Sequence, residues 1–226
     1  MAKKRKPKTP PPRRPEKRPE PRLYLFAPPL AEAGGFPALL EEVLSEVDVA
    51  CVVAMANGAA PAALRALLLA LAPVAARHGA ALLSGEPEMV NAAGTDGVHT
   101  RGAGSALDAA LAALKPGFIV GASDARTRHD AMEVGERDID YLMYGDPAPD
   151  GWTPPMEETL ERVSWWAEIF NIPCVAFAPR LEDVGPLVAA GADFIALGAA
   201  VWDDPRGPVT AAREAEDRAV AAMADA

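Results

Sequence analysis

Short apolar runs alternate with longer amphipathic runs along the chain from residue 23 onward. The short runs are apolar at nearly every position, which predicts strands that are covered on both faces. There are eight such runs, at residues 23–28, 49–55, 80–85, 96–100, 118–123, 140–145, 173–178 and 193–198. A chain built in this way is predicted to fold as an α/β protein.

A stretch with apolar residues at helical spacing follows each predicted strand. The clear helical stretches lie at 36–47, 61–79, 105–116, 156–171 and 208–226, and weaker ones at 86–94, 127–137 and 181–190. Gly79, Gly94 and Gly191 stand where a glycine would end a helix before the next strand. Eight strand–helix units predict a single (β/α)8 TIM barrel. A doubly wound open sheet is the alternative, but no GxGxxG follows the first strand.

Residues 1–22 differ from the rest of the chain in composition and in charge. Ten Lys and Arg against two Asp and Glu give this segment a charge of +8, whereas the whole chain carries −10, which leaves −18 on residues 23–226. A segment so rich in proline and charge cannot bury enough surface to fold, so we expect a disordered arm before a barrel over 23–226. The arm either solubilises the protein or makes nonspecific contacts with polyanions.

Other features bear on location and assembly. No run of 18 apolar residues occurs, which argues against a membrane span. Cys51 and Cys174 lie in apolar runs without a CxxC motif, which predicts reduced, buried thiols in a cytoplasmic protein. One residue of the pair Trp165–Trp166 should pack against the barrel. The other, if exposed, would mark a contact in a homo-oligomer. Trp202, after the eighth strand, either closes the bottom of a pocket or packs on the last helix.

Candidate site residues follow the carboxyl ends of the predicted strands, where TIM barrels carry their active sites. His99 ends one strand and is either a general base or a structural hydrogen-bonding residue. Arg101 and Arg180 follow two strands, and arginine can hold a phosphate with two parallel bonds. Glu86 and Asp146 are the carboxylates that could bind a metal ion, although both also suit an ordinary acidic turn or loop.

Three stretches resemble the thiamine phosphate synthase and thiazole tautomerase family: AAGTDGVHT, FIVGASDARTRHDAMEVGERDIDYLMYG and IPCVAFAPRLEDVGPLVAAGADFIALGAAVW. The most specific pieces are D-G-V-H at 96–99, G-x-S at 121–123, D-Y-x-x-x-G at 140–145 and A-G-A-D at 190–193. The resemblance covers residues 23–205 and implies a small TIM barrel in thiamine biosynthesis. The family's synthases join a pyrimidine pyrophosphate to a thiazole phosphate, with Mg²⁺ on the departing pyrophosphate.

The chain departs from the family at most of its charged positions. The family's Q-x-R-x-K pattern is replaced by Cys51, Val53 and Met55, and its second metal-binding carboxylate is lost from residues 100–104. The loop at 146–152 has no lysine, and the family's Gly-Gly turn is replaced by Ala178 and Pro179. The resemblance therefore implies a lost Mg²⁺–pyrophosphate site. No cofactor is expected, and Mg²⁺ is expected only if the family's reaction survives.

A few family features remain. Ser123 matches the family's serine and joins His99 as a candidate catalytic residue. Backbone N–H groups of Gly198, Ala199 and Ala200 are expected to bind phosphate beside Arg101 and Arg180. We therefore expect a barrel that binds a phosphorylated thiazole or thiamine compound. The alternatives are a catalytically inactive regulatory barrel and a different enzyme for a small phosphorylated metabolite. If the chain is active, it is a synthase-type transferase or a tautomerase-type isomerase.

Overall fold

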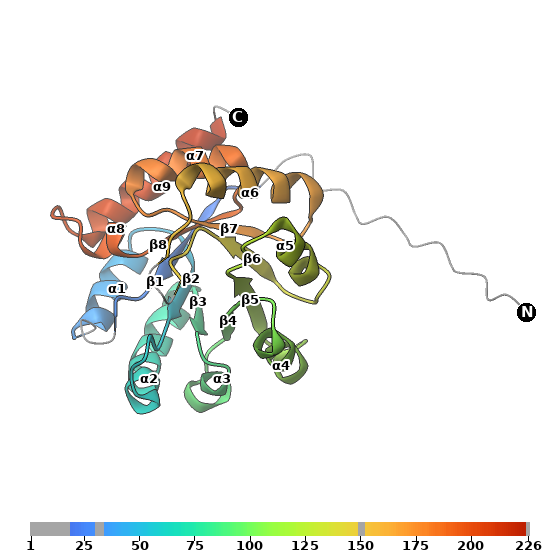
Figure 1. The fold of residues 1–226 in the computed structure, drawn as a ribbon. Helices are drawn as coiled ribbons and strands as arrows, with labels where there is room; N and C mark the ends of the chain where they lie inside the picture. The colour runs from blue at the N-terminus through green and yellow to red at the C-terminus, as the bar shows by residue number, and fades with distance from the viewer. Residues whose placement is uncertain (1–18, 30–33, 149–151, 225–226) are drawn as a thin grey trace, which may run out of the picture.

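The computed structural model describes residues 19–29, 34–148 and 152–224. Eight parallel strands pair in chain order and close between β8 and β1, with helices around them (Figure 1). The strands are β1 (Arg22–Phe26), β2 (Val49–Ala54), β3 (Ala81–Ser84), β4 (Gly97–Arg101), β5 (Ile119–Ser123), β6 (Tyr141–Tyr144), β7 (Cys174–Phe177) and β8 (Phe194–Leu197). The predicted (β/α)8 TIM barrel is confirmed, and the open-sheet alternative is wrong.

The helices occupy the predicted places between the strands. They are α1 (Phe36–Leu44), α2 (Pro61–His78), α3 (Glu88–Ala93), α4 (Ser105–Leu114), α5 (Arg128–Gly135), α6 (Met156–Ile169), the 3₁₀ turn η2 (Leu181–Asp183), α7 (Val184–Ala190), α8 (Ala199–Trp202) and α9 (Pro208–Ala224). The short α8 was not predicted. The stretch predicted as one helix over 181–190 is divided into η2 and α7.

Glycines end three of the helices, as predicted. Gly79, Gly94 and Gly191 follow α2, α3 and α7 with φ angles of 70°, 67° and 112°. These left-handed conformations cost glycine little because it has no Cβ atom. Each helix therefore ends at the residue before its glycine, and the chain turns toward the next strand.

The barrel begins at the last residue of the predicted arm. Arg22 is the first residue of β1, and its guanidinium holds Asp48 at 2.7 Å. Residues 1–18 of the arm lie outside the described residues. Within the described residues, no helix is both long enough and apolar enough to cross a membrane. Cys51 and Cys174 are buried, as predicted, and are not joined in a disulfide.

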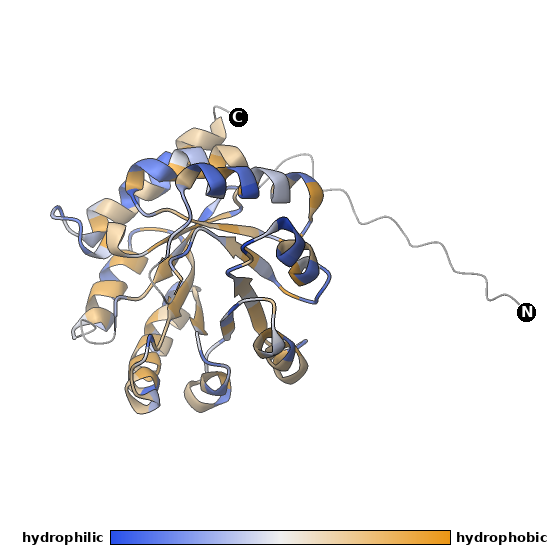
Figure 2. Cartoon of the chain, in the orientation of Figure 1, coloured by the Kyte–Doolittle hydropathy of each residue, from blue (hydrophilic) through white to orange (hydrophobic). Residues whose placement is uncertain are grey.

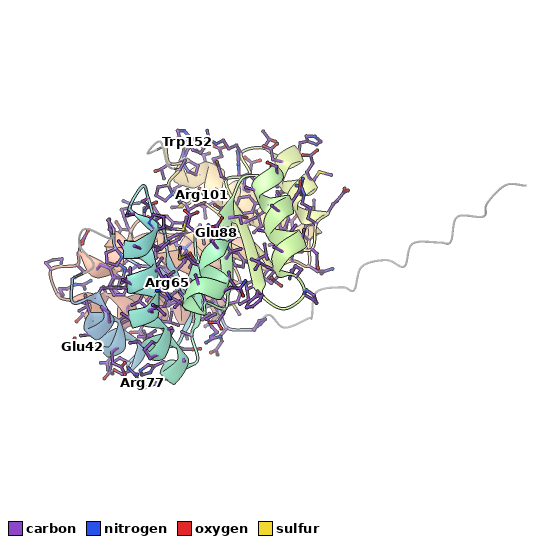
Figure 3. All side chains as sticks on the ribbon, turned by 90° about the horizontal axis from the view of Figure 1, so that it is seen from below. Glu42, Arg65, Arg77, Glu88, Arg101 and Trp152 are labelled. Atoms are coloured by element: carbon purple, nitrogen blue, oxygen red, sulfur yellow. The ribbon has the colours of Figure 1, made fainter. Side chains whose placement is uncertain are left out.

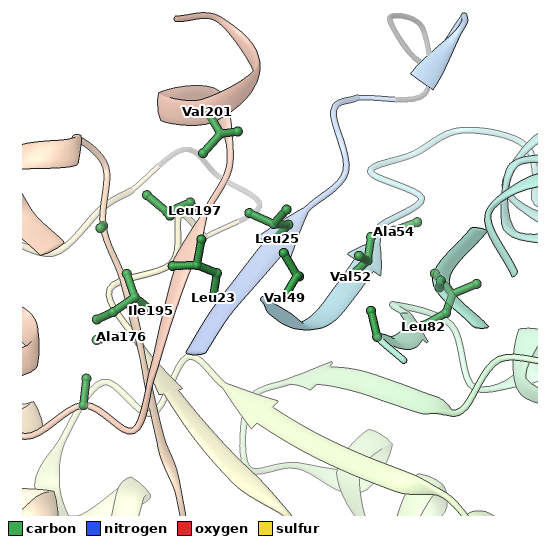
Figure 4. Packing of buried hydrophobic residues seen from close by; sticks show 14 of the residues in the cluster. Leu23, Leu25, Val49, Val52, Ala54, Leu82, Ala176, Ile195, Leu197 and Val201 are labelled. Atoms are coloured by element: carbon green, nitrogen blue, oxygen red, sulfur yellow. The ribbon is translucent and has the colours of Figure 1, made fainter. Parts of the chain in front are cut away.

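Two hydrophobic cores lie on the two sides of the barrel wall. The larger core fills the space between strands and helices, where Leu23, Leu25 and Val52 pack (Figure 4). Trp166 of α6 belongs to it and is fully buried, which confirms that one residue of the tryptophan pair packs inward. The strands are apolar along their length, whereas α5 and α6 carry many hydrophilic residues (Figure 2). The polar outer surface is thus concentrated on the helices.

The smaller core lies inside the barrel and includes two tyrosines. Its buried members are Tyr24, Cys51, Val53, Leu83, Tyr141, Met143, Val175 and Ala196. Side chains alternate between the two faces of a strand, so these inward residues stack in layers. The layers above them, toward the carboxyl ends of the strands, carry the site.

Candidate ligand-binding site at the barrel mouth

A cavity of about 840 Å³ opens at the carboxyl ends of the strands, and we call it the mouth cavity. Its apolar lining includes Phe26, Met55, Phe177 and Trp202. Its polar side chains among the described residues are Asn57, Glu86, His99, Arg101 and Asp203. The volume is within the range typical of small-molecule sites. The mouth cavity is therefore where a ligand would bind.

Aromatic side chains form one wall of the mouth cavity. The rings of Phe26 and Phe177 meet edge to face, with centroids 5.8 Å apart. The Nε1–H group of Trp202 donates to the carbonyl of Phe26 at 2.6 Å, and the Trp202 ring meets Phe36 edge to face. These contacts hold the Trp202 side chain in the wall of the mouth cavity. Such a wall suits a planar heterocyclic ring.

His99 lies at the floor of the mouth cavity and is fully buried. The strand register pairs His99 with Gly121 and Gly121 with Tyr141. Because Gly121 has no side chain, the Tyr141 ring crosses it and stacks on the imidazole, with centroids 5.8 Å apart and planes 13° apart. The His99 Nδ1 atom lies 2.8 Å from the Tyr141 hydroxyl, and Nε2 lies 3.2 Å from Ser123 Oγ.

Both nitrogens of His99 are therefore occupied by protein groups. Burial, together with the charge of Arg101, lowers the pKa of His99 to about 3, so the imidazole is neutral at physiological pH. A general base needs a free nitrogen within reach of the substrate. This geometry favours the structural hydrogen-bonding role of His99, and its catalytic role stays a prediction.

Ser123 and Asp146 lie one layer behind the cavity wall. Ser123 is fully buried, is not part of the lining, and donates its hydroxyl to Asp146 Oδ2 at 3.0 Å. Burial raises the pKa of Asp146 to about 6, although Arg101 and the Ser123 bond oppose that rise. Ser123 would thus reach a ligand only through a neighbouring side chain, and Asp146 is a buried carboxylate that titrates close to neutral pH.

Arg101 stands at the rim of the mouth cavity, at the end of the barrel opposite Arg77 (Figure 3). Its Nη1 atom lies 3.2 Å from Asp146 Oδ2 and 2.5 Å from the carbonyl oxygen of Pro147. The side chain is only 20% exposed. Arg101 thus joins β4 to the loop after β6, and its charge is already balanced by Asp146.

The remaining phosphate-binding candidates divide into two groups. Arg180 is bound to Asp183 and Glu182, its side chain is 64% exposed, and it does not line the mouth cavity. Gly198 and Ala199 do line the cavity, at the beginning of α8, whereas Ala200 does not. The structure thus brings Arg101, Gly198 and Ala199 to one cavity. Phosphate binding by any of these residues stays a prediction.

Among the described residues, the carboxylates of the site do not form a metal-binding cluster. Glu86 lines the mouth cavity, and burial, with help from Glu88, raises its pKa. Asp146 lies behind Arg101 and already accepts bonds from Ser123 and Arg101. Within the described part of the chain, no three His, Cys, Asp or Glu side chains gather where they could hold a metal ion. Asp150, the other acidic residue of this loop, lies outside the described residues.

Sequence reasoning missed Tyr24 and Tyr141, which complete the polar network under the cavity. Their hydroxyls lie 2.8 Å apart. A signal was available, since Tyr24, His99 and Tyr141 each stand next to an outward-facing apolar residue of the same strand, namely Leu23, Val98 and Leu142. An inward polar layer in a barrel of otherwise apolar strands is unusual and could have been inferred from that alternation.

Comparisons with known proteins agree with this architecture. The family model described as thiamine monophosphate synthase matches residues 23–201. The thiamine-phosphate synthase of Rhodospirillum centenum is 35% identical over 193 residues, which cover 84% of this chain and 93% of that protein. The enzyme of the same name from Hyphomonas neptunium is 34% identical over 207 residues, which cover 87% and 92%.

A solved structure supports the fold. The thiamine phosphate pyrophosphorylase of Pyrococcus furiosus superposes with a TM-score of 0.76 at 19% identity, over 90% of this chain and 97% of that one. At that identity the likeness bears on the fold alone. The match of the family model and the two bacterial relatives carry the assignment. The chain belongs to the thiamine monophosphate synthase family.

Proposed function

We propose that this protein binds a phosphorylated thiazole or thiamine compound in the mouth cavity and does not carry out the Mg²⁺-dependent condensation. The observation that carries the proposal is the charge of the cavity. Among the described residues that line it, Arg101 is the one basic side chain, and Asp146 already balances its charge. Glu86 and Asp203 add two carboxylates to the same lining.

A departing pyrophosphate places heavy demands on such a site. Its several negative charges must be matched by metal ions and cations if the bond to carbon is to break. No cluster of three metal-ligating side chains occurs among the described residues, and those that line the cavity include one arginine, which is why we expect the condensation to be lost. A single phosphate needs less, because one arginine and a few backbone N–H groups can hold it. The aromatic wall would hold the ring of the same ligand.

A proton-transfer reaction of the tautomerase type is the second candidate. It is favoured by the buried Asp146, whose pKa of about 6 suits proton exchange near neutral pH and which reaches His99 through Ser123. An isomerisation of this kind needs neither a metal ion nor a pyrophosphate site. The two candidates share the same ligand class and differ in whether the bound ring is converted.

Turnover and binding measurements test the proposal together. Purified protein would be given pyrimidine pyrophosphate and thiazole phosphate, with and without Mg²⁺, beside an ordinary synthase. We expect no thiamine phosphate from this protein, and micromolar to millimolar binding of thiazole phosphate or thiamine phosphate in calorimetry. Mg²⁺-dependent product at a rate near that of the control would overturn the proposal. Conversion of the bound thiazole without condensation would favour the isomerase.

Two arginine variants identify the phosphate contact. A charge-assisted hydrogen bond contributes about 1.5–3 kcal/mol, so R101M is expected to weaken binding about ten- to hundredfold. R180M is the matched control, since Arg180 lies outside the cavity lining and is bound to Asp183. The reverse result, with R180M weakened and R101M unchanged, would move the phosphate to the loop after β7.

The partners and the location also remain proposals. We propose that the arm at residues 1–22 contacts polyanions and that the protein works in the cytoplasm, in keeping with its two buried cysteines, which form no disulfide with each other. We also propose a homo-oligomer in which the partly buried Trp165, which lies under the Arg128 guanidinium, contributes to the contact. Sedimentation of the full chain would decide the oligomeric state.

A further inference from the structure

A chain of hydrogen bonds runs through the interior of the barrel toward its mouth. The Tyr24 and Tyr141 hydroxyls lie 2.8 Å apart, and Tyr141 lies 2.8 Å from His99 Nδ1. The chain continues from Nε2 to Ser123 at 3.2 Å and from Ser123 to Asp146 at 3.0 Å. We call this series the interior chain. Its members, in order, are Tyr24, Tyr141, His99, Ser123 and Asp146.

The ionised carboxylate of Asp146 fixes the direction of every bond in the interior chain. A carboxylate only accepts, so the single proton of Ser123 must point toward it. Ser123 then accepts from His99, which places the imidazole proton on Nε2. The bare Nδ1 accepts from Tyr141, and Tyr141 accepts from Tyr24. The neutral imidazole that this arrangement requires agrees with the lowered pKa of His99.

The interior chain contacts a cavity at each end of the barrel, although its last member, Asp146, lies behind the wall of the mouth cavity. His99 and Arg101 line the mouth cavity. Tyr24 and Tyr141 line a hollow of about 280 Å³ where the strands begin, and we call it the basal hollow. Events at the mouth cavity are therefore linked by hydrogen bonds to groups at the opposite end of the barrel.

Arg101 is the cation in direct contact with Asp146. The other charged groups around Asp146 come from the end of β5 and from α6, and they are engaged elsewhere. Asp124 is paired with Arg126 at 2.7 Å, and Arg162 of α6 is paired with Glu158. Asp124 acts on Asp146 in the opposite sense to Arg101, since it favours the protonated carboxyl. Burial has the largest effect on the pKa of Asp146, and among the charged groups around it Arg101 has the largest effect.

We propose that Asp146 sets the tautomer of His99 through Ser123, and that Arg101 controls this setting from the rim of the mouth cavity. An anionic ligand that draws Arg101 away leaves the carboxylate without its cation, and Asp146 takes up a proton. The interior chain then loses its fixed direction, and the Nδ1–H form of His99 becomes accessible. This inference goes beyond the proposed function and does not require it.

The proton transfers balance along the interior chain. Ser123 passes its proton to Asp146 and receives the proton of His99 Nε2. Nδ1 receives the proton of Tyr141, and Tyr141 receives that of Tyr24. Tyr24 is restored by one proton from solvent, reached through the basal hollow that Tyr24 lines. The net change is one proton taken from solvent and held by Asp146, with every bond of the chain reversed.

Nitrogen-15 NMR of the histidine side chains tests, in the ligand-free protein, whether Asp146 sets the tautomer of His99. The chain has three histidines, so the signals of His99 can be assigned. At pH 8 we expect the Nε2–H tautomer, and we expect the Nδ1–H tautomer to appear as the pH falls through about 6. In R101M the midpoint should move upward by about one pH unit, because the carboxylate has lost an adjacent cation. R180M should match the wild-type protein.

Two further variants keep the test decisive. D146N removes the titrating group, and S123A breaks the interior chain without changing any charge. In either variant, the tautomer of His99 should no longer depend on pH between 5 and 8. A wild-type tautomer that stays constant over this range, or a change that persists in S123A, would overturn the inference. Failure of thiamine phosphate to bind would count against the proposed function alone, since these spectra need no ligand.

Discussion

Two buried side chains, Asp146 and His99, carry opposite pH dependences of folding stability. The pKa of Asp146 is raised by burial from 3.8 to about 6, so the folded state holds this proton more tightly than the unfolded state. Its contribution to the free energy of unfolding falls as the pH rises from about 4 to 6. The pKa of His99 is lowered from 6.5 to about 3, so its contribution falls as the pH drops below 6.5.

D146N separates the two effects at the residue scale. The variant removes the Asp146 titration and keeps His99. Its free energy of unfolding relative to that of the wild-type protein should therefore increase as the pH rises from 4 to 6.5. Two pKa units correspond to about 3 kcal/mol, at about 1.4 kcal/mol per unit. Urea unfolding across this range measures the difference. Curves for the two proteins that stay parallel would show that Asp146 titrates alike in the folded and unfolded states.

The same residues show what a sequence can predict about a site. His99 was identified because it ends a predicted strand, and all such ends meet at one edge of the barrel, whereas Ser123 was identified because it matches the family's serine. The contact between His99 and Ser123 was not predicted. The hydrogen bond between His99 and Tyr141, which are 42 positions apart in the chain, was not predicted either. Such contacts depend on strand register, which local patterns do not specify. Arg180 also follows a strand, yet its local acidic neighbours hold it outside the cavity lining.

At the scale of elements, strand register decides which side chains of β4 and β6 meet across β5, which lies between them. A methyl group on Gly121 would overlap the Tyr141 ring. G121A is therefore expected to lower the free energy of unfolding by about 1–3 kcal/mol, the usual cost of overpacking. It should also shift the His99 signals, since Tyr141 could no longer lie against the imidazole. Chemical unfolding and the NMR spectra described above measure the two effects.

Two comparisons make this prediction specific. G117A is the control, because a methyl group there meets only a carbonyl oxygen at 3.8 Å. In the double variant G121A/Y141L, the leucine at position 141 relieves the overlap. The loss of unfolding free energy should therefore be smaller than the sum of the losses in the two single variants. Strict additivity would mean that Gly121 matters for backbone conformation and not for the Tyr141 ring.

The elements themselves were predicted well, because their signals are local. Strands were found from continuous apolar runs, and the ends of three helices from Gly79, Gly94 and Gly191. The helix α8 was missed because four residues are too few to show a helical period. Closure of the barrel followed from eight repeated units, since each strand pairs with the next along the chain.

The largest feature at the scale of the whole molecule is the separation of charge. The arm at residues 1–22 carries +8, and residues 23–226 carry −18. A polyanion such as RNA is repelled by the barrel and attracted by the arm. Any such binding must therefore act through the arm and must weaken steeply as salt is added, because it releases counterions.

Removal of residues 1–18 tests this directly, since those residues include nine of the ten basic side chains of the arm. The full chain is expected to bind a single-stranded RNA of random sequence at low salt, with a log–log salt slope of about −3 to −6. The shortened chain should not bind, because only the acidic barrel remains. Fluorescence anisotropy at several salt concentrations gives both results. Equal binding by the two chains would place the contact on the barrel, against its net charge, and would require a local basic patch there.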